Sequence, residues 1–184
     1  MTARKPLVVA TGQAQQLQSA DTLDATIQTV RIHAPAVADP SSPTPVDGDL
    51  YFNTAIDEWM EYDGGRAKWL SITGLTILSG ADGGTNAGSF YRFGTLAYGT
   101  NIGHTVPKGT LVGLAWSRTD SAAATLEVLV GGSVIATLAS SAAGSVVNWA
   151  LNADFAEGRM QFRNQAGGNT ATNVIITAIL KRRA

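Results

Sequence analysis

From residue 73 onward, short apolar segments recur about every ten residues and are separated by glycine-rich turns. The clearest pair, 125–130 and 133–138, flanks Gly131-Gly132. Such a two-residue turn supplies the positive backbone φ angles that a tight β-hairpin needs. Short strands at this spacing are typical of a β-sandwich or jelly roll. The sequence therefore predicts an all-β jelly-roll or β-sandwich domain over 73–184.

The last expected strand, 173–180, is apolar on both of its faces. Side chains alternate along a strand, so Val174 and Ile176 share one face. Ile175 and Ile179 lie on the other face. A strand that is apolar on both sides is buried on both sides. This pattern predicts either a central strand of the sandwich core or a contact between the subunits of a trimer.

Low charge is the main compositional feature of the chain. Charged residues make up 15% of the sequence, whereas an average globular protein has about 25%. A solvated helical bundle needs Lys, Glu and Arg on its polar faces, so this composition disfavours one. It favours short strands, many turns and surfaces that are buried in an assembly.

Composition also argues against several classes of function. The chain has 13 Lys+Arg against 14 Asp+Glu, and this balance lacks the positive charge of a nucleic-acid-binding protein. It has no Cys, which removes disulfides, thiolate nucleophiles and cysteine-based zinc sites. No apolar run approaches the roughly 18 residues of a membrane-spanning helix, and the apolar run 7–10 is too short for a secretion signal. We expect folding in a cytoplasm, with neither nucleic-acid binding nor membrane insertion.

Residues 1–33 are expected to form an extended segment that cannot bury a core of its own and therefore attaches to another protein. Its first run is Lys5, Pro6, Leu7, Val8 and Val9. Residues 34–48 contain four of the six prolines. A proline-rich sequence favours polyproline-II geometry, so this stretch is predicted to be a semi-rigid linker.

Residues 49–72 predict a small β-meander. The expected strands are 49–53, 58–62 and 68–72, with turns at 54–57 and at Asp63-Gly64-Gly65. Tyr51, Trp59 and Trp69 are expected to cluster on one face. A meander of this size is marginal in isolation, so three copies packing around an axis would give it a core.

Motifs for catalysis or metal binding are missing from the sequence. His33 and His104 are isolated, without the spacing of a metal site, and are expected to be solvent-facing loop residues. The glycine-rich stretch 79–84 lacks the lysine of a phosphate-binding loop, and tight turns explain its glycines. No serine lies in a G-x-S-x-G elbow. We therefore expect no catalytic residues, no cofactor and no metal.

Two aromatic residues are candidates for stacking against a sugar of a receptor. Tyr91 and Tyr98 lie close together in the loop-rich entry to the β domain. In the alternative interpretation, Phe90, Phe93 and Tyr98 cap the sandwich core.

Three stretches of the chain resemble virion proteins of tailed bacteriophages. Residues 4–23 carry K-P-L-V, a glycine turn, Q-Q-L and D-T-L, and look like an N-terminal module of phage fibre and decoration proteins. Residues 48–69 are similar to the "GDLYFNT…YDG…W" repeat of phage tail fibres. Residues 106–180, with Leu114-Ala115-Trp116-Ser117-Arg118 and the Gly131-Gly132 hairpin, resemble jelly-roll heads at the tips of trimeric fibres.

The resemblance implies a non-enzymatic structural protein of a phage virion, assembled in the bacterial cytoplasm. It implies a short homotrimeric fibre whose N-terminal residues, Lys5 to Val9, attach to a tail, neck or capsid protein. The jelly-roll head would then contact a host-surface glycan or protein. No long shaft lies between the modules, so a capsid decoration fibre remains an alternative. A polysaccharide-degrading enzyme is a third hypothesis.

Overall fold

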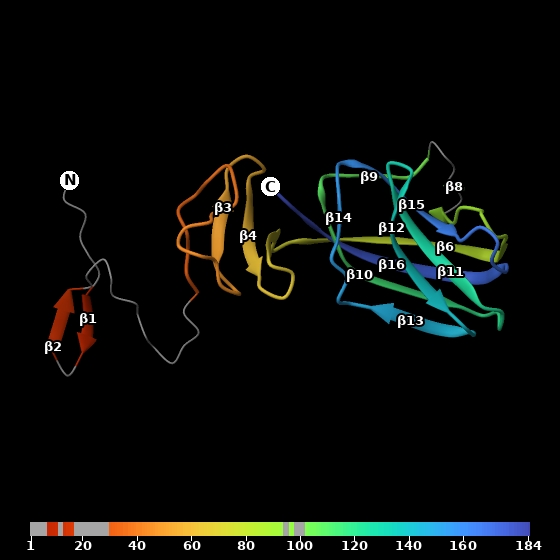
Figure 1. Ribbon diagram of the computed structural model, residues 1–184, viewed down its shortest axis with the longest axis horizontal. Helices are drawn as coiled ribbons and strands as arrows, with labels where there is room; N and C mark the ends of the chain where they lie inside the picture. The colour runs from red at the N-terminus through yellow and green to blue at the C-terminus, as the bar shows by residue number, and fades with distance from the viewer. Residues whose placement is uncertain (1–6, 11–12, 17–29, 94–95, 98–101) are drawn as a thin grey trace. The chain divides into compact units, whose positions relative to one another are not determined.

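The computed structural model describes residues 7–10, 13–16, 30–93, 96–97 and 102–184. It contains only β-strands and no helix within these ranges, which confirms the predicted all-β class (Figure 1). The chain divides into two compact units, Met1–Arg31 and Ile32–Ala184. We call the second unit the body.

The described part of the first unit is a β-hairpin. β1 (Leu7–Ala10) pairs antiparallel with β2 (Gln13–Gln16), with Leu7 opposite Gln16. The extended conformation predicted for Leu7, Val8 and Val9 is confirmed, whereas Lys5 and Pro6 of the predicted attachment segment lie outside the described residues.

The body begins with a three-stranded antiparallel sheet, which we call the small module. Its strands are β3 (Leu50–Asn53), β4 (Glu58–Asp63) and β5 (Lys68–Ser71). The three strands predicted from the sequence are confirmed to within one residue at each end. The residues that form hairpin turns are local signals, so the sequence alone was sufficient to predict these three strands.

The proline-rich segment 34–48 packs against the small module and is not a free linker, so that prediction is wrong. Ala36 forms a parallel bridge with Asn53. The Tyr51 hydroxyl donates a hydrogen bond to Asp39 Oδ1 at 2.7 Å, and the Trp69 indole N–H donates to the Pro40 carbonyl at 3.0 Å. Buried Tyr and Trp side chains need partners for their polar ends, and this segment supplies them.

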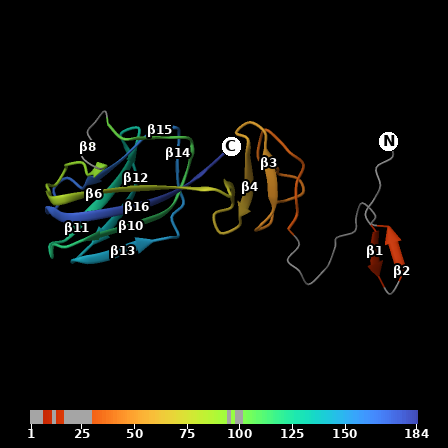
Figure 2. The same ribbon diagram turned by 180° about the vertical axis from the view of Figure 1, so that it is seen from behind.

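The rest of the body is a sandwich of two antiparallel sheets, seen from opposite sides in Figures 1 and 2. The front sheet has the order β13-β10-β16-β6-β7-β8, and β14 also pairs with β10. Its strands are β6 (Gly74–Thr85), β7 (Arg92–Phe93), β8 (Leu96–Ala97), β10 (Gly109–Arg118), β13 (Gly144–Asn148), β14 (Ala153–Phe155) and β16 (Ala171–Arg182). The back sheet has the order β12-β11-β15-β9. Its strands are β9 (His104–Val106), β11 (Ala124–Val130), β12 (Ser133–Ser140) and β15 (Gly158–Asn164).

The hydrophobic core lies between the two sheets, as expected for a sandwich. Trp116 and Ile176 contribute from the front sheet, and Val128 and Phe162 from the back sheet. Gly131 and Gly132 both have positive φ, at 59° and 87°. They form the β11–β12 turn that the sequence predicted.

The 12-residue strand β6 was not predicted. The sequence assigned tight turns to the glycines of 79–84, but β6 pairs with β16 through this stretch. A bulge lies where Asp82 and Gly83 face Asn173, and Gly83 N–H donates to Asn173 Oδ1 at 2.8 Å. The glycines permit a positive φ of 79° at Gly83 in this bulge.

Candidate functional site

Arg66 joins the small module to the sandwich. It lies in the turn between β4 and β5, and its Nε donates to the Leu151 carbonyl at 2.7 Å. Its Nη2 donates to the carbonyls of Val112 and Trp149, each at 3.1 Å, and Nη1 pairs with Asp63 at 2.6 Å. The fork-shaped guanidinium makes several directed bonds at once, so one side chain fixes the module against the front sheet.

Asp154 is the second polar centre of this junction. Its carboxylate accepts hydrogen bonds from Lys68 Nζ at 2.7 Å and from Thr110 Oγ1 at 2.6 Å, and Arg183 pairs with it at 2.6 Å. Burial by itself raises the pKa of Asp154, but the hydrogen bonds and the two positive charges outweigh it and hold the pKa below its usual value. The ionised carboxylate therefore stabilises the contact between the small module and the sandwich.

A pH dependence follows for Asp154→Asn. A carboxyl whose pKa is lower in the folded chain than in the unfolded chain contributes stability above the unfolded value, about 3.9. That contribution is lost as the pH falls through the folded pKa. We expect wild type to melt at a higher temperature than Asp154→Asn at neutral pH, and the difference to shrink below about pH 4. Calorimetric scans from pH 7 to pH 2 measure this, and a difference that stays constant throughout would contradict it.

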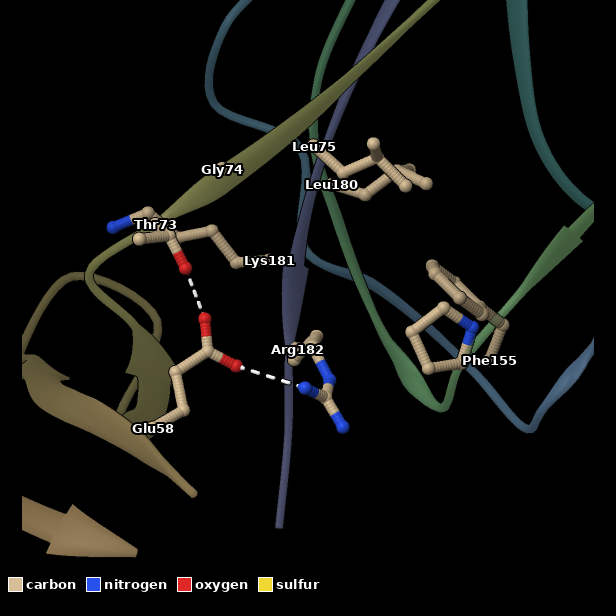
Figure 3. Close-up of a pocket in the computed structure, with 9 residues that line it drawn as sticks. Glu58, Thr73, Gly74, Leu75, Phe155, Leu180, Lys181 and Arg182 are labelled. Atoms are coloured by element: carbon tan, nitrogen blue, oxygen red, sulfur yellow. Dashed lines mark hydrogen bonds and ion pairs between the residues drawn. The ribbon is translucent and has the colours of Figure 1, made fainter. Parts of the chain in front are cut away.

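A cavity of about 130 Å³ lies beside this junction (Figure 3). Leu75, Leu180 and Phe155 form apolar walls, and Glu58 lies on the polar side. The Glu58 carboxylate accepts a hydrogen bond from the Thr73 hydroxyl and pairs with Arg182 at 3.2 Å. Among the described lining residues Glu58 is the sole carboxylate, so the cavity does not provide the carboxyl pair of a glycosidase.

The predicted aromatic cluster of the small module is correct for two of its three members. Tyr51 and Trp69 are buried together, with ring centroids 4.9 Å apart. Trp59 is 41% exposed and pairs with Phe52 at 5.6 Å. Trp59 lies opposite Phe52 in the sheet, so strand alternation directs it to the other face, and Met60 takes the core position opposite Tyr51. The prediction for Trp59 is wrong because it did not include the pairing register.

Neither histidine is the solvent-facing loop residue that the sequence predicted. The His33 side chain is almost fully buried, with Nε2 at 3.1 Å from Asp49 Oδ2 and its ring edge-on to Trp69. His104 lies in β9, and partial burial lowers its pKa. The sequence did not reveal either environment. The partner of His33, Asp49, lies 16 residues away, and the burial of His104 arises only in the folded sheet.

The candidate receptor aromatics are not supported as a pair. Tyr91 is fully buried in the sandwich core, and its backbone N–H donates to the Phe162 carbonyl at 2.9 Å. The receptor-facing prediction is therefore wrong for Tyr91. Of the residues in the alternative core interpretation, Phe90 is partly buried and packs against the core. Tyr98 lies outside the described residues.

The apolar last strand, β16, lies between β10 and β6 in the front sheet. Val174 and Ile176 are buried in the core, which confirms their predicted place in a central strand. Ile175 points to the opposite side and is 65% exposed, and Ile179 is half-buried. The subunit contact expected for Ile175 and Ile179 stays a prediction.

The chain matches no known family model, and no curated protein or solved structure is detectably similar to it. Within the described ranges, no three His, Cys, Asp or Glu side chains gather in a way that would hold a metal ion. The same ranges contain no helix of the length and apolarity needed to cross a membrane.

Proposed function

We propose that this chain is a non-enzymatic structural protein of a phage virion. It forms a short homotrimeric fibre that is anchored by its N-terminal unit and presents its β-sandwich for adhesion to the host surface. The observation that carries the proposal is the division of the chain into a small unit, Met1–Arg31, and a body that starts at Ile32. A separate N-terminal unit suits attachment to another virion protein. The resemblance of residues 4–23, 48–69 and 106–180 to phage modules, in that order, supports the same reading.

The junction within the body also fits a fibre. Arg66 and Asp154 connect the small module to the sandwich through directed hydrogen bonds and ion pairs. Because these contacts hold the small module and the sandwich together, the body can present the sandwich as one rigid unit without a long shaft. With Tyr91 buried, Trp59, which is 41% exposed and contacts Phe52, offers an aromatic ring that could stack against a host glycan.

Deleting residues 1–31 is expected to abolish incorporation of the chain into virions while the body remains folded. The deletion must end at Arg31, because Ile32 bridges to Leu50 and His33 pairs with Asp49 in the body. Quantitative mass spectrometry of purified virions measures incorporation, and we expect a loss of at least about tenfold relative to the full chain. Circular dichroism and thermal melting of the purified body are the control for folding. Unchanged incorporation with a folded body would refute the anchor.

The two alternatives make different predictions. A capsid decoration fibre fits the lack of a long shaft in the sequence, and it would place the body over the whole capsid surface. A polysaccharide-degrading enzyme would shorten host polysaccharide when it is incubated with the purified chain. Products of lower mass in that assay would replace the fibre proposal with the enzyme.

A further inference from the structure

The outer face of the front sheet is continuous, exposed and uncharged over its middle. One row of side chains crosses four strands, since the pairing register places Leu78, Thr177, Ala115 and Val147 side by side. This row alternates with the buried one that faces the core, so it points outward. Leu78 is 55% exposed and Val147 52% exposed. We call the surface formed by this row and its two neighbouring rows the outer face.

The neighbouring rows have the same character. Ile175 and Ile179 lie on either side of Thr177 along β16, and both point outward. Trp149 covers the outer side of Gly113, where an added Cβ would come within 2.6 Å of the indole ring. The remaining outward positions of these rows are Gly, Ser or Thr. The outer face thus exposes large apolar side chains on a sheet that lacks charge at its centre.

Among the described residues, charged side chains lie at the ends and edge of this face and not at its centre. Lys181 lies at the end nearest the small module, Asp82 lies at the opposite end of β6, and Arg92 pairs with Gly80 at the β6 edge. An apolar centre inside a polar rim is the usual anatomy of a protein–protein interface. A monomeric surface normally disperses its exposed apolar residues.

The open edge of this sheet is also uncharged. No Asp, Glu, Lys or Arg occurs between Glu127 and Asp154. This stretch includes β13 at the edge of the front sheet and β12 at the edge of the back sheet. Free-standing edges usually carry Lys, another charged residue or a proline, which prevents pairing with other chains. These edges therefore lack the charges that would oppose contact with another uncharged chain.

The outer face is large enough to form the centre of a subunit contact. Its three rows span about 20 Å along the strands, and four strands make it about 19 Å wide. The resulting area of about 380 Å² is about half of the roughly 800 Å² that each partner contributes to a standard stable interface, so the polar residues around the face would supply the rest. A hollow of about 210 Å³, bordered by Trp116, Val147 and Ile175, offers space for a side chain of the partner.

We propose that the outer face packs against a second copy of this chain. The proposal rests on the homotrimer of the proposed function and assigns its contact surface. A face without charge at its centre has no groups that could form ion pairs with an acidic or basic partner. It is complementary to another uncharged face of the same kind. The net charge of −1 gives copies little electrostatic repulsion. In a trimer the outer faces of all three copies turn toward the threefold axis, so each face meets both neighbours and the apolar side chains of every copy leave water.

Light scattering on purified variants tests the surface. We expect wild type to have about three times the chain mass of 19.1 kDa. Ile175→Asp and Val147→Asp place a carboxylate at the centre of the outer face, and each is expected to lower the mass threefold, to that of the monomer. Both side chains are more than half exposed in the single chain, so the sandwich core is left intact. Ile102→Asp, at a residue that is 49% exposed outside the face, is the matched control and is expected to remain trimeric.

The outcomes separate this inference from the proposed function. A monomeric wild type would overturn both the homotrimer and its surface. A trimeric wild type whose Ile175→Asp and Val147→Asp variants also stay trimeric would overturn only the outer face. The chain has no cysteine, so Ile175→Cys and Ile102→Cys give a second readout that does not disturb assembly. We expect a maleimide to react at least tenfold more slowly at position 175 than at position 102, and equal rates would contradict the proposal.

Discussion

Replacing Asp120 with alanine is expected to lower the free energy of unfolding of the body by about 3–5 kcal/mol. The Arg118 side chain is fully buried, and Asp120 is its ion-pair partner. Arg118 also donates to the Ser140 carbonyl at 3.0 Å and lies over the Trp116 ring. The other carboxylate oxygen of Asp120 accepts the Thr172 backbone N–H at 2.7 Å. Without Asp120, the guanidinium remains in the core without its counter-charge.

Urea unfolding followed by tryptophan fluorescence measures this change. Asp82→Ala is the matched control, because Asp82 is an exposed carboxylate on β6, and surface substitutions usually change stability by less than about 0.5 kcal/mol. A loss of less than 1 kcal/mol in Asp120→Ala would show that the buried pair does not stabilise the sandwich in the way the structure indicates.

Arg66→Ala is expected to cost about 2–3 kcal/mol, because the carbonyls of Val112, Trp149 and Leu151 each lose a charged donor. The small module should also unfold at a lower temperature than the sandwich, since three of its hydrogen bonds to the sandwich are removed. Differential scanning calorimetry measures both effects. Arg66→Lys keeps the positive charge beside Asp63 but loses the planar fork, so it is expected to restore only part of the stability. Arg92→Ala, at an exposed arginine, is the control. One unshifted transition in Arg66→Ala would contradict the assigned role.

The parts of the fold that the sequence predicted depend on local signals. The β11–β12 hairpin follows from the Gly131-Gly132 turn and the alternating side chains around it. The three strands of the small module follow in the same way. Such signals act within a few residues, so they need no knowledge of the tertiary structure.

The errors have long-range causes. β6 was missed because its glycines are explained only by β16, about ninety residues later in the chain, where Gly83 bonds to Asn173. The proline-rich segment was taken for a spacer because the Tyr51 hydroxyl and Trp69 N–H that bind it become visible only in the folded module. Proline predicts an extended backbone, but it does not determine whether that backbone is packed.

The junction shows the same limit for the candidate site. Arg66 lies 85 residues from Leu151, to which it donates, and no pattern in the sequence connects them. The outer face could be predicted from the sequence only in part. Alternation along the last strand predicted that Ile175 and Ile179 share a face, whereas the extent of the uncharged surface required the register of β6, β10 and β13.

Antibody labelling of virions tests the central claim most directly. An antibody raised against residues 32–184 is applied to purified particles of the phage that encodes the chain, and gold labels are located by electron microscopy. The fibre proposal predicts labels on the particle, at the tail for a tail fibre and over the capsid for a decoration fibre. Particles from a phage that lacks the gene should carry none. Unlabelled wild-type particles, together with absence of the chain from their protein content by mass spectrometry, would contradict the proposal that it is a virion protein.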